Sequence, residues 1–260
     1  MYPAERKLAI LAEASAGDGR VSVALLSTRL GVTPATIRRD LGDLEREGML
    51  RRQHGGARLI RTLPFELSLP DRRSTERVER ARIARAVVEM LPQDGVVLLD
   101  SGALILSIAE AFPANRHLMV VTNNLPAARL LAGHKSLATL VLPGRVRHLT
   151  QASVDEWTRS RLSGLNVDLA VIGANGVTAG GVTTTIPAEA AVKRAMIVAA
   201  QRRVLAVTAL KFGVRSFCEF AALDDFDEIV TDARIDEVQR REITDAGGAL
   251  TVVDAQQPDV

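Results

Sequence analysis

The sequence predicts an α/β protein of two domains, a small helical N-terminal domain and a larger domain built on a mainly parallel sheet. Three observations support this prediction. Three short helical patterns and a hairpin signal fill the first 60 residues, six short Val- and Leu-rich runs alternate with helical segments after residue 76, and the stretch between them, TLPFELSLPDRRS, carries two prolines and no clear period. The predicted boundaries are 1–60, a linker at 61–75, and 76–260.

The composition is that of a globular protein, with 47% apolar and 25% charged residues. No apolar run reaches the roughly 18 residues that a membrane span needs. The N-terminus, MYPAERKLAILAEAS, has charged residues within its apolar part, unlike a signal peptide. The single cysteine, Cys218, excludes an internal disulfide, and its flanks, SFCEFAAL, are typical of a strand carrying a structural thiol. We therefore expect a cytoplasmic protein with no membrane partner.

Net charge differs between the two predicted domains. Residues 1–75 hold 13 Lys and Arg against 9 Asp and Glu, a net charge of +4, whereas residues 76–260 hold 20 against 22, a net charge of −2. A basic N-terminal domain fits nucleic-acid binding, but many small domains carry such a charge, so the asymmetry is only supporting evidence.

The first two helices are short and separated by glycines. The first spans roughly Ala4–Ser15, and its apolar face is predicted to contain Leu8, Leu11 and Ala12. AGDGR then breaks the pattern. Ser22 is suited to cap the second helix, whose apolar face consists of Val23, Leu26 and Leu30.

A third helix is predicted from Pro34 to Glu47, after a tight turn at LGV. Thr33 suits the N-cap, and Pro34 takes the first helical position, where its missing N–H costs nothing. The apolar residues Ile37, Leu41 and Leu44 share one side. Gly48 ends the helix, and MLRRQHGGARLI then reads as two extended runs joined at HGG. This order of elements is that of a winged helix-turn-helix, in which the second helix of the motif enters the DNA major groove.

The polar side of the third helix is the predicted DNA-contact face. Arginine binds guanine bidentately, and a threonine at a helix N-terminus can hold a phosphate. The alternative is a solvated helix supported by an Arg39–Asp43 pair. Asp40 lies beside the apolar stripe, so we expect it to form an ion pair within the domain. In the hairpin, Arg51 is a weaker candidate than its neighbours. The predicted DNA-binding residues are Thr33, Ala35, Thr36, Arg38, Arg39, Arg52 and His54.

The second domain alternates strand and helix after an amphipathic helix, TERVERARIARAVVEML. The six extended runs are DGVVLLDSG, HLMVVTNN, ATLVLPG, DLAVIGANG, RVLAVTALK and DEIVTD, and helices are predicted at 104–112, 125–132, 188–200 and 236–246. This alternation indicates a mainly parallel sheet covered on both faces. Ligands bind outside the carboxyl ends of such strands, so the turn residues that follow the runs are expected to converge there.

These segments resemble one family. VTPATIRRDLGDLEREGMLRRQHGGA resembles the N-terminal signature of the DeoR-type bacterial transcriptional regulators, and the segments DSG, VTNN, DLAVIGANGV, EAAVKRAMI, KFG and IVTD follow in that family's order. The resemblance covers about Arg6 to Asp232. It implies a regulator of a sugar-catabolism operon, with a sensor domain similar to ribose-5-phosphate isomerase that binds a phosphorylated sugar.

The sequence departs from the family at the phosphate-binding turn. Ala103 and Leu104 stand where two threonines are usual, and the usual second glycine after Gly144 is Arg145. Backbone N–H groups at the helix N-terminus could still hold an anion, and Arg145, Arg147 and His148 could supply positive charge. The predicted ligand-binding residues are Asp100, Ser101, Gly102, Thr122, Asn123, Asn124, Gly144, Arg145, Gly173 and Lys211.

The sequence therefore predicts a DNA-binding transcriptional regulator, with repression favoured over activation. Its predicted partners are double-stranded operator DNA, a phosphorylated sugar and further copies of the chain in a dimer or tetramer. Two alternatives stay open: a body that only oligomerises, and a phosphosugar isomerase with Asp100 as its base. We expect no catalytic residue, cofactor or metal site. Glu189 and Lys193 are spaced to support their helix as an i,i+4 pair.

Overall fold

The computed structural model describes residues 2–16, 20–46, 50–59, 69, 76–113 and 115–253 of the 260-residue chain. The chain divides into two compact units, Met1–Leu67 and Ser68–Val260, which we call the head and the body. The linker predicted at 61–75 lies outside the described residues except for Leu69. This leucine is buried, and its N–H donates to the carbonyl of Leu149 at 2.8 Å.

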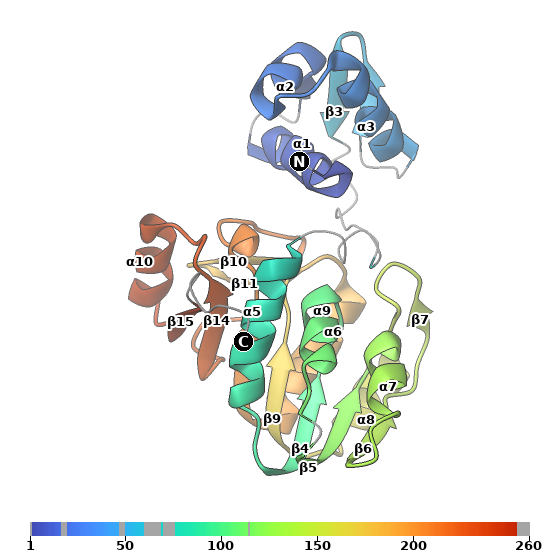
Figure 1. Ribbon diagram of the computed structural model, residues 1–260, viewed down its shortest axis with the longest axis vertical. Helices are drawn as coiled ribbons and strands as arrows, with labels where there is room; N and C mark the ends of the chain where they lie inside the picture. Colours follow the sequence, from blue (N-terminus) through green and yellow to red (C-terminus); the bar gives the residue numbers. More distant parts are fainter. Residues whose placement is uncertain are drawn as a thin grey trace. The chain divides into compact units, whose positions relative to one another are not determined.

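The described residues of the head form three helices and a small antiparallel sheet, which Figure 1 shows. The sheet has the strand order β1-β3-β2, so a short strand that the sequence did not predict joins the hairpin as its third member. The elements are α1 (Pro3–Ala16), β1 (Arg20–Ser22), α2 (Val23–Leu30), α3 (Pro34–Arg46), β2 (Leu50–Gln53) and β3 (Gly56–Leu59). This is the predicted winged helix-turn-helix order.

The head's core confirms the predicted faces of α2 and α3 and corrects that of α1. Ile37, Leu41 and Leu44 of α3 are each at most 1% exposed. In α1 the prediction of Ala12 was wrong: this alanine is exposed, and the buried apolar residues are Ile10, Leu11 and Ala14. Arg6, one turn before Ile10, is buried on the same face.

Arg6 is buried because it binds Asp40, which confirms the ion pair expected for this aspartate. Arg6 Nε and Nη2 donate to the two carboxylate oxygens of Asp40 at 2.7 and 3.0 Å. This bidentate hydrogen bond raises the pKa of the guanidinium above its ordinary value. The pair ties α1 to the buried side of α3. Ser22 lies at the N-cap of α2 as predicted, but its side chain makes no capping hydrogen bond.

The body is an α/β unit built on a seven-stranded sheet in which every pairing is parallel. Its strand order is β15-β14-β12-β9-β4-β5-β6. The strands of this sheet are β4 (Asp94–Leu99), β5 (His117–Thr122), β6 (Leu137–Val141), β9 (Val167–Ile172), β12 (Ala200–Ala206), β14 (Glu228–Asp232) and β15 (Leu250–Val253). The structure confirms all six predicted runs and adds β15.

Helices cover both faces of this sheet. On one face α5, α6 and α7 share a core with the strands, and on the other face α8, α9 and α10 do so together with a smaller antiparallel sheet, β10-β11-β13 (Figure 1). The helices are α5 (Arg77–Glu89), α6 (Ala103–Glu110), α7 (Leu125–Leu131), α8 (Glu156–Leu162), α9 (Pro187–Ala199) and α10 (Glu237–Asp245). The remaining elements are β7 (Val146–Arg147), β8 (Ala152–Ser153), β10 (Gly176–Thr178), β11 (Gly181–Thr184), the 3₁₀ turn η1 (Ala209–Lys211) and β13 (Cys218–Ala221).

The strand order places a topological switch point between β4 and β9. From β4 the chain builds outward through β5 and β6, then crosses to β9 and builds in the other direction. The loops that follow β4 and β9 therefore diverge at the carboxyl edge, where open parallel sheets hold ligands. Asp100 follows β4 and Gly173 follows β9, so both lie at this point.

Candidate functional site

The polar side of α3 is available to a partner. Thr33, Ala35, Arg38 and Arg39 are exposed, and Thr36 is half-buried. Thr33 caps the helix as predicted, because its Oγ1 accepts from the backbone N–H of Thr36 at 3.2 Å and lies 2.9 Å from Thr36 Oγ1. The buried stripe on the opposite side fixes the helix against the head, so these side chains project from a rigid support.

The two arginines have no internal partner among the residues that the structure describes. No described hydrogen bond or ion pair involves Arg38 or Arg39. Asp43, which would pair with Arg39 in the alternative of a solvated helix, binds Arg46 at 2.5 Å and Lys7 at 3.5 Å. The guanidinium groups are therefore free to bind an anion.

The hairpin presents further basic groups. Arg51, Arg52 and His54 are exposed, and His54 lies in the turn between β2 and β3. The backbone N–H of Arg52 donates to Glu45 Oε1 at 2.9 Å, which joins the hairpin to the end of α3. This hydrogen bond connects the element that carries Arg38 and Arg39 to the element that carries Arg52.

In the body, Asp100 is the centre of a buried polar cluster. It is 1% exposed and forms an ion pair with Lys193, which is 5% exposed. The backbone N–H of Gly173 donates to Asp100 Oδ2 at 3.0 Å, and Lys193 Nζ donates to the carbonyl of Gly173 at 2.8 Å. The strand ends of β4 and β9 are thereby joined to α9 at the switch point.

The asparagine turn after β5 adjoins this cluster. Asn124 Nδ2 donates to the carbonyl of Gly102 at 3.4 Å, and its Oδ1 caps α7 by accepting from the N–H of Ala127 at 3.2 Å. Asn123 Nδ2 donates to the carbonyl of Ser153 at 3.1 Å, whereas its buried Oδ1 has no hydrogen-bond partner within the described residues. A ligand hydroxyl that reached this buried acceptor would satisfy it.

The other predicted ligand residues are less tightly connected. Ser101 is half-buried beside Asp100, and Thr122 is buried, with its Oγ1 accepting from the N–H of Asn124 at 3.0 Å. Gly144 has a φ of +141° and leaves no room for a side chain, because a Cβ there would collide with Thr158 Oγ1. The exposed Arg145 donates its backbone N–H to Asp155, the N-cap of α8.

The prediction that Lys193 and Glu189 pair with each other to support their helix was wrong. Both side chains were predicted to support α9, but both are buried and bind residues of other elements. Glu189 accepts from Arg147 Nη1 at 2.8 Å and from Thr184 Oγ1 at 3.0 Å, so it connects α9 to β7 and β11. A signal existed for Lys193, which lies three residues after Ala190 and three before Met196, on the buried face of α9.

Lys211 lies in the turn after β12, and a second ionic cluster holds that turn. Arg234 binds Asp232 at 2.7 Å and Glu76 at 2.6 Å, and Asp232 Oδ2 accepts from the N–H of Ala209 at 2.8 Å. Burial alone would raise the pKa of Asp232, but the hydrogen bonds from Arg234 and Ala209 outweigh it and hold the pKa below the ordinary aspartate value.

This shift predicts how the body responds to acid. A depressed carboxylate pKa adds stability above the unfolded-state pKa of about 3.9, and that stability is lost as pH falls through the lower folded-state pKa. We expect Asp232→Asn to lower the free energy of unfolding at pH 7 and to converge with the wild type in acid. Denaturant unfolding, followed by circular dichroism at pH values from 7 into acid, measures the free energy of unfolding of the variant and of the wild type. Asp224→Asn, at an exposed acid, is the control. A difference in unfolding free energy between Asp232→Asn and wild type that stays constant with pH would contradict the lowered pKa of Asp232.

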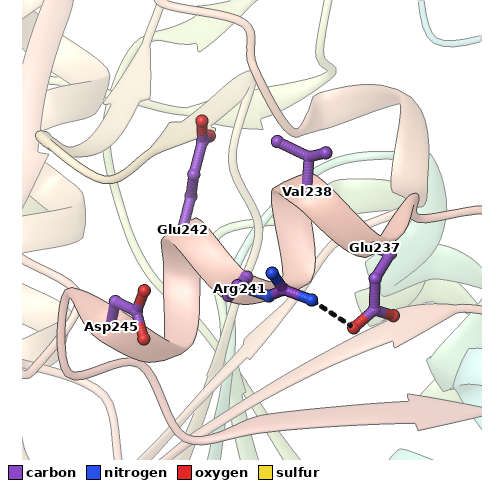
Figure 2. Close-up of a pocket in the computed structure, with 5 residues that line it drawn as sticks. All are labelled: Glu237, Val238, Arg241, Glu242 and Asp245. Atoms are coloured by element: carbon purple, nitrogen blue, oxygen red, sulfur yellow. Dashed lines mark ion pairs between the residues drawn. The ribbon is translucent and has the colours of Figure 1, made fainter.

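A hollow on the described surface lies along α10, and none of its lining residues belongs to either cluster. Its lining residues all belong to that one helix, and Arg241 pairs with Glu237 across it at 3.8 Å (Figure 2). None of them is a predicted ligand residue. Within the described part of the chain no group of His, Cys, Asp or Glu side chains is arranged to hold a metal, and no helix has the length and apolar character needed to cross a membrane.

An exposed recognition helix on a winged helix-turn-helix, together with a parallel-sheet body, defines a two-domain DNA-binding transcriptional regulator. Family models agree: residues 9–62 match the DeoR-like helix-turn-helix domain and residues 75–233 match the DeoR C terminal sensor domain. The chain belongs to the DeoR family of transcriptional regulators.

Two curated relatives span most of the chain. It is 35% identical over 255 residues to the HTH-type transcriptional regulator GlpR of Haloferax volcanii, covering 98% of each chain. It is 30% identical over 219 residues to the glycerol-3-phosphate regulon repressor of Escherichia coli, covering 83% of this chain and 86% of the relative. Ribose 5-phosphate isomerase A from Neisseria gonorrhoeae aligns with 52% of this chain and 54% of its own, at 18% identity and a TM-score of 0.37.

Proposed function

We propose that the chain represses a sugar- or polyol-catabolism operon by placing α3 in the major groove of operator DNA. One observation carries the DNA-binding part: Arg38 and Arg39 project from a capped, rigidly packed helix and have no acidic partner within the described residues. Direct contact with base edges and phosphates requires guanidinium groups that are exposed and free in this way.

The operator is best found directly. Purified protein incubated with sheared genomic DNA should retain a small set of promoter fragments, and footprints on them should show repeated or palindromic half-sites. Such symmetry is expected because one head buries a modest interface, so we propose that at least two copies of the chain bind together. Uniform recovery of all fragments would contradict sequence-specific binding. A chromosome-binding regulator of this kind acts in the cytoplasm.

We propose that the body senses a phosphorylated sugar or polyol at the switch point. Three features support this: the convergence of Asp100, Gly102, Asn124 and Gly173, the unsatisfied oxygen of Asn123, and the names of relatives that control glycerol-3-phosphate genes. A ligand can shift operator affinity only by its preference for one of the two DNA-binding states.

Thermal unfolding of the body tests effector binding. Glycerol 3-phosphate and ribose 5-phosphate are suitable probes, with inorganic phosphate as the control for simple anion effects. A bound effector present at 100 times its Kd adds about 2.7 kcal/mol of stability. Asn123→Leu, which removes the unsatisfied oxygen, should reduce the shift. The absence of a shift with every probe would favour the second candidate function.

That second candidate is a body that holds the oligomer together without a ligand. The internal use of Asp100 and Asn124 favours it, because their polar atoms already bind Lys193, Gly173, Gly102 and Ala127. The same engagement argues against an isomerase, which needs a carboxylate free to take a substrate proton. Conversion of ribose 5-phosphate during the titration would overturn our proposal that the chain is not an enzyme.

A further inference from the structure

The short β7–β8 hairpin of the body lies against the asparagine turn that follows β5. Ala152 of β8 forms an isolated antiparallel bridge with Asn124. The backbone N–H of Ser153 donates to the carbonyl of Asn123 at 2.9 Å, and Asn123 Nδ2 donates to the carbonyl of Ser153 at 3.1 Å. The Asn123 side chain, whose Oδ1 has no hydrogen-bond partner within the described residues, therefore holds the hairpin through its Nδ2.

An ion pair also connects this hairpin to α9. Arg147 Nη1 of β7 lies 2.8 Å from Glu189 Oε1, and the two side chains are 16% and 4% exposed. One helical turn after Glu189, the same helix carries Lys193, the partner of Asp100. Two routes, the asparagine turn and α9, thus connect the hairpin to the residues at which we propose that an effector binds.

The turn of the hairpin binds the segment that leads to the head. Leu149 lies in this turn, and its carbonyl accepts from the backbone N–H of Leu69 at 2.8 Å. Leu69 is 2% exposed, and in the sequence it lies between β3, the last strand of the head, and α5, the first helix of the body. The hairpin therefore contacts the proposed effector site through β8 and the predicted linker through its turn.

Two features of this turn store strain. Gln151 has a φ of +52°, in the left-handed region that costs free energy in residues other than glycine. Thr150 is 2% exposed, and its Oγ1 has no hydrogen-bond partner in the part of the chain that the structure describes. Such features persist only where surrounding contacts hold them, and they are found at switch regions. Here the contacts of Arg147 and Ser153 supply the restraint.

We propose that the β7–β8 hairpin relays the occupancy of the effector site to the linker, through the strength with which its turn holds Leu69. This inference rests on the proposed effector binding and adds the element that carries the signal. A ligand hydroxyl bound to Asn123 Oδ1 acts on the same amide that holds Ser153, so occupancy changes the balance between a held and a released hairpin. A ligand shifts an equilibrium only by its preference for one state, and release of the strained turn supplies the second state.

Hydrogen exchange at the Leu69 amide measures the relay in the full-length protein without a ligand, and mass spectrometry with electron-transfer fragmentation resolves this single residue. Arg147→Gln removes the ion pair to Glu189 and should speed the exchange several-fold, because exchange follows the opening equilibrium. Gln151→Gly relieves the left-handed strain and should slow the exchange several-fold. Arg161→Gln, at an exposed arginine of α8, is the control and should leave the exchange rate unchanged.

Operator affinity provides the functional measurement. On one fragment recovered from the genomic pull-down, Arg147→Gln and Gln151→Gly should change the affinity several-fold in opposite directions, because one favours the released hairpin and the other the held hairpin. Arg147→Lys keeps the positive charge and should return both the exchange rate and the affinity towards wild type. Thermal midpoints identify a variant that fails to fold, and Gln151→Gly, which removes an exposed side chain, keeps the relay testable in that case.

Three results would overturn the relay while the proposed function stands. Exchange at Leu69 that is unchanged in both variants would show that the hairpin does not hold the linker. Faster exchange in both would indicate a general loosening of the body. Opposite changes in exchange with an unchanged operator affinity would show that the signal stops at the linker.

Failure of the proposed function is recognised separately, in the wild type. A wild-type protein that binds no recovered fragment overturns the proposed DNA binding, and the inference with it. A wild type whose thermal midpoint responds to no sugar phosphate overturns the proposed sensing, and the relay of its signal with it. The exchange measurements on the variants need neither DNA nor ligand, so they show whether the hairpin itself has failed.

Discussion

Replacing Arg38 and Arg39 together with alanine should nearly abolish specific operator binding. Each arginine that contacts a base or phosphate contributes about 1–3 kcal/mol, so each single variant should lose between several-fold and about 150-fold in affinity. The adjacent positions share one DNA surface, so the double variant measures their combined effect and need not equal their sum. Fluorescence anisotropy with an operator fragment at fixed salt measures the affinities of the two single variants and of the double variant.

The fold should survive this substitution. Both side chains are exposed and bind no described residue, and alanine favours the helix. Arg161→Ala removes the same kind of charge from α8 of the body and should leave operator affinity unchanged. Operator affinities equal to wild type in all three α3 variants would contradict the assignment of α3 to the groove.

Replacing Lys193 with methionine should destabilise the body by about 3–5 kcal/mol, because removing one partner of a buried ion pair leaves the remaining charge uncompensated. Methionine approximates the length of the lysine stem, but it leaves the Asp100 carboxylate 1% exposed and without its cation. The decrease in unfolding free energy is measured by denaturant unfolding at pH 7.

A second substitution separates charge from packing. Asp100→Asn added to Lys193→Met removes the stranded charge while keeping an oxygen that accepts from the N–H of Gly173. We expect the double variant to recover most of the lost stability. Lys135→Met, at an exposed lysine, should change little. A Lys193→Met variant that loses less than about 1 kcal/mol would show that the pair does not hold the switch point together.

The sequence predicted the fold best where apolar residues repeat at a regular spacing or form continuous runs. Ile37, Leu41 and Leu44 repeat at helical spacing, and all three are buried in α3. The six Val- and Leu-rich runs of the body all form strands of one parallel sheet, because strands covered on both faces need continuous apolar residues. Short elements were missed despite visible signals. Asp155 caps α8, and LTVV forms the seventh strand β15.

Contacts between distant segments could not be predicted in the same way. The period of α9 places Lys193 on its buried face, but nothing local specifies that Asp100, 93 positions away in the sequence, lies opposite. Arg6 is a similar case, since its inward position depends on Asp40 of another helix. The turn residues after β4, β5 and β9 were predicted to converge, and hydrogen bonds join these three turns. Their ligand contacts, and those of Lys211, stay predictions.

Chemical protection of guanine N7, an atom of the major groove, tests the central claim most directly. On an operator fragment the wild-type protein should protect guanines in each half-site, and Arg38→Ala/Arg39→Ala should lose that protection at protein concentrations that still coat the DNA. Guanines left fully reactive in a stable wild-type complex, or protection that persists in the double variant, would contradict the insertion of α3 into the major groove.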